Sequence, residues 1–320
     1  MKFRTEIQIA PYTPDARIGY TNHLFALGSC FAEQMTARLR QLHFNCTTNP
    51  TGVLFNPLSI ACALRHFTAD TPVQRDELHE TEGIWHHFDF HGSFSALSPD
   101  HALTTMNAAR TAGVEALRHA DRLLLTFGTA WVYEYEGQVV ANCHHHPAAE
   151  FTRRRLTVAE IVATFASLFA DTLADRQVIL TVSPVRHIGD GLEDNALSKA
   201  TLRLAAAELA ERFPHVRYFP SYEIMNDDLR DYRFYADDLV HPAPQAVAYI
   251  WEQFARTVLT DEAQRLIPLV AQIVTAAAHR PQHPTSNAFR TFCRQQLAQI
   301  DALPQINFTE ERSYFEQNSK

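Results

Sequence analysis

The stretch HLFALGSCFAEQMTARLRQL, residues 23–42, decides the fold, because its hydrophobic pattern changes abruptly in the middle. Residues 23–27 are mostly apolar, which is typical of a short buried strand. In residues 31–42, apolar side chains recur four positions apart and predict a helix with one buried face. Gly28 lies between the two patterns and allows a sharp turn. A buried strand, a turn and a helix in this order indicate an α/β fold.

The same alternation continues along the chain. Continuous apolar strands that alternate with helices predict a doubly wound parallel sheet of about five strands. After about residue 260 no strand pattern remains, and two helices are expected. We therefore predict an α/β domain over residues 1–260 and a C-terminal helical appendage over residues 261–320. The further predicted strands are 121–127, 177–184 and 216–221, and the helices are 156–173, 195–213, 244–259, 261–278 and 286–303.

Composition and charge exclude several classes of protein. The 320 residues are 46% hydrophobic, enough for a large core, and the formal net charge of −8 argues against a nucleic-acid binder. No apolar run reaches the roughly 18 residues that a membrane span needs. The first twenty residues lack the apolar core of a secretory signal. Five cysteines without a CxxC pair favour a reducing, cytoplasmic environment.

Two small nucleophilic residues, Ser29 and Cys30, follow the turn at Gly28 directly. They lie at the predicted start of a helix, where unpaired N–H groups and the positive end of the helix dipole stabilise a thiolate or a developing oxyanion. This position suits a catalytic nucleophile. The alternative is structural, with Ser29 as the helix N-cap and Cys30 as a small buried side chain.

A second candidate group lies just before the helix predicted over 244–259. Asp238 and His241 are three residues apart in a D-x-x-H pattern. A carboxylate on one ring nitrogen of histidine fixes the tautomer and leaves the other nitrogen able to accept a proton. The alternative is a surface loop in which the aspartate caps the helix and the histidine has no role.

Several further stretches carry a resemblance to a known family. They are GSCFA (28–32), NPTGVLFNPLSI (49–60), FGTAWVY (127–133), VVANCHHHP (139–147), TVSPVRH (181–187), LSKATL (197–202) and DDLVHP (237–242). Through these stretches the chain resembles the GSCFA family, within the SGNH/GDSL hydrolase superfamily, over about residues 20–260. This resemblance implies a parallel α/β fold and an acyl hydrolase. No cofactor is expected, because the sequence lacks separated pairs of metal ligands and offers a complete set of nucleophile, base and carboxylate.

The resemblance implies a nucleophile, a base and an orienting carboxylate. The G-D-S block of the superfamily lies, without gaps, over residues 28–30 and places Cys30 at the nucleophile position. Ser29 stays open as the alternative, although it would require Leu27 to replace the glycine of the turn. The D-x-x-H block corresponds to Asp238 and His241, as orienting carboxylate and general base.

The two oxyanion-hole blocks match less well. The resemblance places the second block at Gly52, whose N–H would serve the oxyanion. The third block, G-x-N, lies over residues 128–130, where Ala130 stands at the asparagine position. A side-chain donor must then come from elsewhere, with Asn142 as the first candidate and Thr129 as the second.

Other polar residues in these stretches are expected to contact the substrate. The histidine-rich stretches 85–91 and 143–147 do not predict a metal, because adjacent side chains of an extended chain point in different directions. They are expected to line the substrate cleft. Arg186 can contact an anionic group or form a structural salt bridge. The predicted substrate-binding residues are Asn49, Gly128, His144, Arg186 and His187.

These expectations favour one function and leave two others open. The favoured function is hydrolysis of an ester or thioester through an acyl-enzyme, with a small-molecule or glycan acyl ester as substrate. The first alternative is an acyltransferase that passes the acyl group to a glycan hydroxyl or another acceptor. The second is a non-catalytic binding protein on a degenerate scaffold, suggested by Ala130 at the asparagine position.

Overall fold

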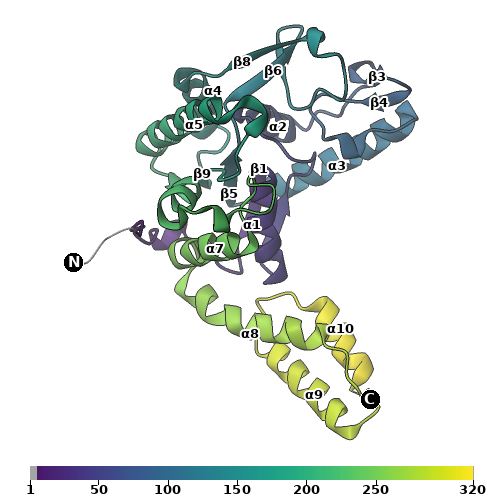
Figure 1. Ribbon diagram of the computed structural model, residues 1–320. Helices are drawn as coiled ribbons and strands as arrows, with labels where there is room; N and C mark the ends of the chain where they lie inside the picture. The colour runs from purple at the N-terminus through teal and green to yellow at the C-terminus, as the bar shows by residue number, and fades with distance from the viewer. Residues whose placement is uncertain (1–5, 320) are drawn as a thin grey trace, which may run out of the picture.

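The central sheet of the protein is parallel and lies between two layers of helices. The computed structural model describes residues 6–319 (Figure 1). Five strands pair in the order β10–β9–β5–β1–β2, and every pairing is parallel. This arrangement confirms the predicted α/β fold. The strands are β1 (His23–Gly28), β2 (Asn45–Thr48), β5 (Arg122–Phe127), β9 (Gln177–Val182) and β10 (Val216–Phe219).

The strand order reverses next to β1. The chain moves from β1 outward to β2, and then in the opposite direction through β5, β9 and β10. In doubly wound sheets, ligands bind at the carboxyl ends of the strands that flank such a reversal. The ends of β1 and β5, at Gly28 and Phe127, therefore mark the expected position of the site.

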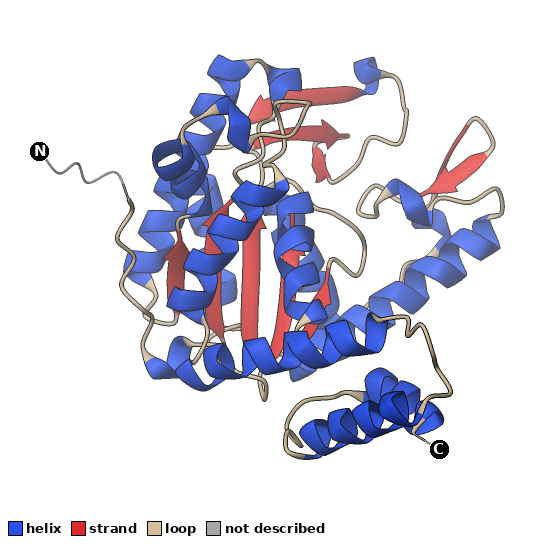
Figure 2. Ribbon diagram, turned by 60° about the horizontal axis from the view of Figure 1, so that its bottom comes forward, coloured by secondary structure: helices blue, strands red, loops and turns tan. Residues whose placement is uncertain are grey.

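Helices cover both faces of the sheet (Figure 2). Apolar side chains on both faces hold these helices in place. Along β1, Leu24 and Ala26 pack into one core cluster and Phe25 and Leu27 into the other, because successive side chains of a strand point to opposite faces. Burial on both faces is why the strands are recognisable as continuous apolar runs. The first face is covered by α1 (Cys30–Gln41) and α7 (Pro244–Val258), and the second by α2 (Pro57–Ala69), α3 (Pro99–His119), α4 (Val158–Ala170) and α5 (Leu192–Arg212).

Two small antiparallel sheets were not predicted from the sequence. The three-stranded one follows β5 directly and pairs in the order β7–β6–β8. The hairpin β3–β4 lies beside it, because the ring of His79 on β3 contacts that of Tyr135 on β6, with the centroids 5.6 Å apart. All these strands are short and mostly half-exposed, so their hydrophobic pattern is weak. They are β3 (His79–Thr81), β4 (Ile84–His86), β6 (Trp131–Tyr135), β7 (Gln138–Val140) and β8 (Phe151–Arg155).

A helical region follows the sheet domain at the C-terminal side. The helices expected over 261–278 and 286–303 correspond to α8 and α9, whereas α10 was not expected from the sequence. His43, just after α1, lies 3.0 Å from Glu311 of α10 through Nε2 and Oε1. Because α1 ends at the amino-terminal edge of the sheet, these helices lie opposite the strand carboxyl ends (Figure 1). The remaining helices are α6 (Ser221–Glu223), α8 (Asp261–Ala278), α9 (Asn287–Asp301) and α10 (Thr309–Asn318).

Within residues 6–319, none of the helices combines the length and the apolar character that crossing a membrane requires.

Candidate active site

The turn after β1, residues 28–30, forms an elbow that only glycine can begin. Gly28 has a φ of +144°, and a Cβ there would lie 2.3 Å from the carbonyl oxygen of Thr126 on β5. Its N–H donates to Asn49 Oδ1 over 2.9 Å. The Asn49 amide also donates to Glu33 at the start of α1 over 3.3 Å. Asn49, expected to contact the substrate, is thus buried and supports the elbow from the loop after β2.

The two candidate nucleophiles differ in their surroundings. Ser29 is buried and caps α1, since its Oγ accepts the N–H of Phe31 over 3.3 Å. Cys30 is the first residue of α1 and is half-buried. Burial, and then the Glu33 carboxylate, raise the pKa of the Cys30 thiol, while the N–H groups of Phe31 and Cys30 and the charge of Lys199 lower it. The capping role predicted as an alternative for Ser29 is therefore present.

Asp238 and His241 form the contact expected of an orienting carboxylate and a base. Asp238 Oδ2 lies 2.7 Å from His241 Nδ1, and Oδ1 accepts the N–H groups of Val240 and His241 over 2.9 and 3.0 Å. These N–H groups, that of His241 first, lower the pKa of Asp238 to about 2. The ionised carboxylate favours a proton on Nδ1 of His241, which leaves Nε2 as a proton acceptor.

Contacts between backbone segments place this pair and the elbow along one edge of the sheet. The N–H of Arg186, just beyond β9, donates to the carbonyl of Val240 over 3.2 Å. Gly128, just beyond β5, packs against the elbow, since a Cβ there would lie 3.4 Å from Ser29 Cβ. The side chain of Lys199 joins the two strand ends by donating to the carbonyls of Gly128 and Ser183 over 2.6 and 2.8 Å.

Among residues 6–319, neither Ser29 Oγ nor Cys30 Sγ is hydrogen-bonded to His241. The Asp238–His241 pair lies on a loop that is largely exposed. In free enzymes, hydrogen bonds between nucleophile and base are often long and shorten only when substrate is bound.

The expected backbone donor of the oxyanion hole is already occupied. Gly52 has a φ of +93°, and a Cβ there would lie 2.1 Å from His91 Cβ, so glycine is required for this close approach. However, its N–H donates to the Asn49 carbonyl over 2.8 Å. An oxyanion would have to share or replace that hydrogen bond.

The two side-chain donors expected for the oxyanion differ in how far their hydrogen-bonding groups are already used within the fold. Thr129 is buried, and its hydroxyl is engaged with Ser198 Oγ at 3.1 Å and with the N–H of Trp131 at 3.1 Å. Asn142 is half-exposed, and its Nδ2 donates to the Phe90 carbonyl over 3.1 Å. An amide group has two N–H bonds, so Asn142 retains one for a ligand.

Two neighbouring cavities bring several of the expected residues together. One of about 350 Å³ is lined by Thr129, Asn142 and His187, together with the rings of Phe55 and Trp131. Gly128 is bound to one of the lining residues, because the Phe55 carbonyl accepts its N–H over 2.8 Å. Aromatic walls with a few polar groups are typical of ligand sites.

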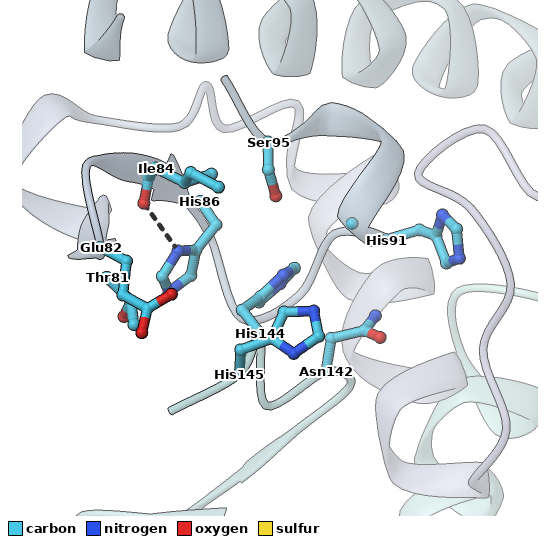
Figure 3. A pocket seen from close by; sticks show the side chains of 10 residues that line it. Thr81, Glu82, Ile84, His86, His91, Ser95, Asn142, His144 and His145 are labelled. Atoms are coloured by element: carbon cyan, nitrogen blue, oxygen red, sulfur yellow. Dashed lines mark hydrogen bonds between the residues drawn. The ribbon is translucent and has the colours of Figure 1, made fainter. Parts of the chain in front are cut away.

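The second cavity, of about 430 Å³, is also lined by Asn142 and is rich in histidine (Figure 3). His144, expected to contact the substrate, lines it and stacks on His86 with the ring centroids 4.5 Å apart. His144 Nε2 lies 2.9 Å from the carbonyl of His87. Asn142 is thus a lining residue of both cavities.

Arg186 lies apart from His187, although the two are adjacent in the sequence. Its guanidinium stacks on the ring of Tyr235 at 4.0 Å. It lines a separate cavity of about 220 Å³, together with Asn226 and Arg230. The predicted substrate residues are thus distributed over three cavities and the elbow.

One group of side chains could hold a metal ion. Asp89 Oδ2 accepts from Cys62 Sγ over 3.7 Å and lies 3.6 Å from His66 Nε2, and the three ligand atoms are within 4.8 Å of one another. Cys62 and His66 are four residues apart on α2 and share a helix face. Such a mixed set of ligands suits zinc. No metal site was predicted from the sequence, and these three residues were not among the candidate site residues.

Lys199 of α5 was not predicted as a site residue. It is 1% exposed, and burial lowers its pKa to about 7. The sequence does contain a signal for it. The chain has 28 lysines and arginines, of which only Lys2, Lys199 and Lys320 are lysines.

Two protein-family models together match most of the chain. The model described as GSCFA family matches residues 23–254, and the one described as GSCFA domain protein, C-terminal domain, matches residues 270–320. No curated protein matches the chain. The first match runs from β1 into α7 and contains the elbow, both strand ends and the Asp238–His241 pair, so this chain belongs to the GSCFA family.

Proposed function

We propose that this protein is an SGNH-type acyl hydrolase that cleaves an ester or thioester through an acyl-enzyme. The observation that carries the proposal is the Asp238–His241 contact of 2.7 Å. It lies beside the end of β9, on the same edge of the sheet as the elbow. A base with its orienting carboxylate, near a nucleophile at a helix N-terminus, is the arrangement that acyl transfer requires.

In the proposed mechanism, Cys30 is the nucleophile. His241 Nε2 accepts the thiol proton while the sulfur attacks the carbonyl carbon of the substrate. The leaving alkoxide or thiolate then takes that proton from His241, and an acyl-enzyme remains. Water, deprotonated by His241, attacks the acyl carbon and releases the acid together with the Cys30 thiolate, which regains its proton from His241. Asp238 stays ionised throughout, since its pKa is about 2, and stabilises the imidazolium.

The oxyanion that forms in each half of the reaction needs hydrogen-bond donors. We assign this role to N–H groups at the start of α1 and to the remaining N–H of Asn142. Gly52 becomes a donor only if its hydrogen bond to Asn49 is released. Thr129 is the weaker candidate, because its hydroxyl is already engaged within the fold.

Asn142 lines both cavities, and we infer that each cavity holds one half of an acyl ester substrate. The 350 Å³ cavity next to Gly128 suits the acyl group, because aromatic rings line it. The 430 Å³ histidine-rich cavity suits a polar alcohol portion such as a sugar. The same observation favours a second candidate function, because a cavity for an alcohol could also hold the acceptor of an acyltransferase.

The proposed location is the cytoplasm. All five cysteines are free thiols, and free thiols persist where the environment is reducing.

The experiment that tests the proposal combines turnover with trapping of the intermediate. Purified protein is assayed with nitrophenyl esters and with acyl thioesters of increasing chain length, and the acyl-enzyme is mapped by mass spectrometry. We expect turnover and acylation within residues 24–38, both lost in His241→Gln. Ester formation on an added glycan would identify a transferase. If neither a substrate nor a fluorophosphonate or iodoacetamide label modifies residues 24–38, the interpretation as a binding protein replaces this proposal.

A further inference from the structure

Lys199 is a buried cation without a buried anion beside it. Its Nζ donates to the carbonyls of Gly128 and Ser183, and the ring of Tyr222 lies 5.9 Å away. Within the part of the chain that the structure describes, no carboxylate forms an ion pair with it. Burial of an ammonium group without a counter-ion is unfavourable. A residue kept at such a position is a candidate for a functional role.

The choice of lysine is unusual for this chain. Lys199 is the single lysine among residues 6–319, where every other residue of the Lys and Arg class is arginine. Arginine keeps its proton in proteins, whereas a buried lysine loses its proton readily. The ammonium group is also compact and can donate to two carbonyls in a closed space. At this position lysine therefore provides properties that arginine lacks.

The position of Lys199 relates it to the elbow. One carbonyl that it binds belongs to Gly128, which packs directly against Ser29. Two charged groups act on the Cys30 thiol in opposite directions, with Glu33 on α1 disfavouring the thiolate and Lys199 on α5 favouring it. Lys199 also faces Tyr222 of α6, which stays neutral because burial raises its pKa.

We propose that Lys199 is a positioning residue that joins the ends of β5 and β9 beside the elbow and promotes ionisation of the Cys30 thiol through its positive charge. This inference rests on the proposed function only in taking Cys30 as the nucleophile. Because the pKa of Lys199 is about 7, its charge changes within the pH range of ordinary assays. Thiol and ammonium are then coupled, and loss of the lysine proton weakens the stabilisation of the thiolate.

The test measures the reactivity of Cys30 and needs no substrate. The rate of alkylation by iodoacetamide is followed from pH 6 to pH 10 by mass spectrometry of the peptide that contains Cys30. In Lys199→Met, and in Lys199→Gln, which keeps a neutral donor, we expect alkylation at pH 6 to 7 to be roughly five- to tenfold slower than in the wild type, as for an interaction of about one pKa unit. Above about pH 9, where Lys199 is neutral in the wild type, the rates should converge.

A matched control is Glu33→Gln, which removes the opposing charge. We expect it to lower the apparent pKa of Cys30 and to accelerate alkylation at pH 7. A structural loosening of the elbow would instead accelerate alkylation in all three variants. An unchanged or faster rate in both Lys199 variants would overturn the proposal.

The wild-type protein provides a second measurement in case the Lys199 variants do not fold. Two coupled ionisations broaden the pH profile of Cys30 alkylation beyond that of a single group. A profile that follows one simple ionisation would therefore also overturn the proposal. If the protein turns over no ester but the Lys199 variants still slow the alkylation of Cys30, the proposed function is refuted and the role of Lys199 is not. The failure of one proposal can thus be distinguished from the failure of the other.

Discussion

Replacement of Lys199 with methionine should change how the stability of the protein depends on pH. In the unfolded chain a lysine holds its proton up to about pH 10.5, whereas in the folded protein burial lowers the pKa of Lys199 to about 7. Between these values the unfolded state binds more protons than the folded state. The free energy of unfolding must therefore rise with pH in this window. Below pH 7 both states are protonated, and the full destabilisation by the buried charge is present.

The size of the effect follows from the two pKa values. Their difference, at about 1.4 kcal/mol for each unit, corresponds to about 5 kcal/mol of destabilisation at low pH. Between pH 7 and pH 9, about 2 kcal/mol of it is relieved, because the folded lysine becomes neutral. Lys199→Met has no such group, and all other titrating groups are shared. The stability of the wild type relative to Lys199→Met should thus increase by about 2 kcal/mol over this range.

Urea denaturation followed by circular dichroism at pH 6, 7, 8 and 9 measures this difference. The dependence of the unfolding free energy on urea should be the same in both proteins, since both expose the same surface. A difference in stability that stays constant from pH 6 to pH 9 would refute the reasoning. It would mean that Lys199 keeps its proton in the fold and that the two carbonyls, at 2.6 and 2.8 Å, stabilise the ammonium fully.

Four further predictions concern the elbow, the base and the cofactor requirement. Cys30→Ala should abolish formation of the acyl-enzyme. Ser29→Ala should retain measurable turnover but lose about 1 kcal/mol of stability, because the helix cap is removed. The reverse result for activity would identify Ser29 as the nucleophile. Asp238→Asn should lower kcat/KM by about 10²–10⁴-fold without changing the melting temperature, because the carboxylate is exposed and orients His241; unchanged kinetics would remove the pair from the mechanism. Gly28→Ala should destabilise the fold by more than about 3 kcal/mol, since its Cβ would lie 2.3 Å from the Thr126 carbonyl oxygen. The control Gly137→Ala, also at positive φ but with nothing within 4 Å of the added Cβ, should cost only about 1–2 kcal/mol. Equal losses of stability in denaturation experiments would contradict the steric argument. Activity should persist in EDTA, and loss of activity that zinc restores would show that a metal is required.

The parts of the fold that were predictable are those with a strong local pattern. The strands of the central sheet, such as 121–127, are apolar on both faces and leave continuous runs in the sequence. The three short strands β6–β8 are half-exposed and pair antiparallel, so their formation depends on neighbours that a local pattern does not contain. The edge strand β2 was missed for the same reason, since its residues are at most half-buried.

The candidate site residues also differ in how far a local sequence pattern could predict them. The elbow and the Asp238–His241 pair lie within short segments, so the turn at Gly28 and the Asp238–His241 contact could be predicted from local spacing, whereas the roles proposed for these residues also rest on the family resemblance. Lys199 reaches a carbonyl 71 positions away in the chain, and Asn49 reaches the N–H of Gly28 from the loop after β2. Such roles depend on which strand ends the topology brings together. The scarcity of lysine and the position of Lys199 within the stretch LSKATL could have pointed to this residue, but neither indicates what its side chain contacts.

The C-terminal helices contact the sheet domain at His43, on the edge opposite the elbow. A fusion partner or a solid support attached through α10 would therefore lie far from the strand carboxyl ends and leave both cavities accessible. Bulky substrates, including acyl groups carried on polymers, could be presented to the protein immobilised in this way. The geometry of the fold thus provides an orientation for surface-based binding measurements without any change to the proposed active site.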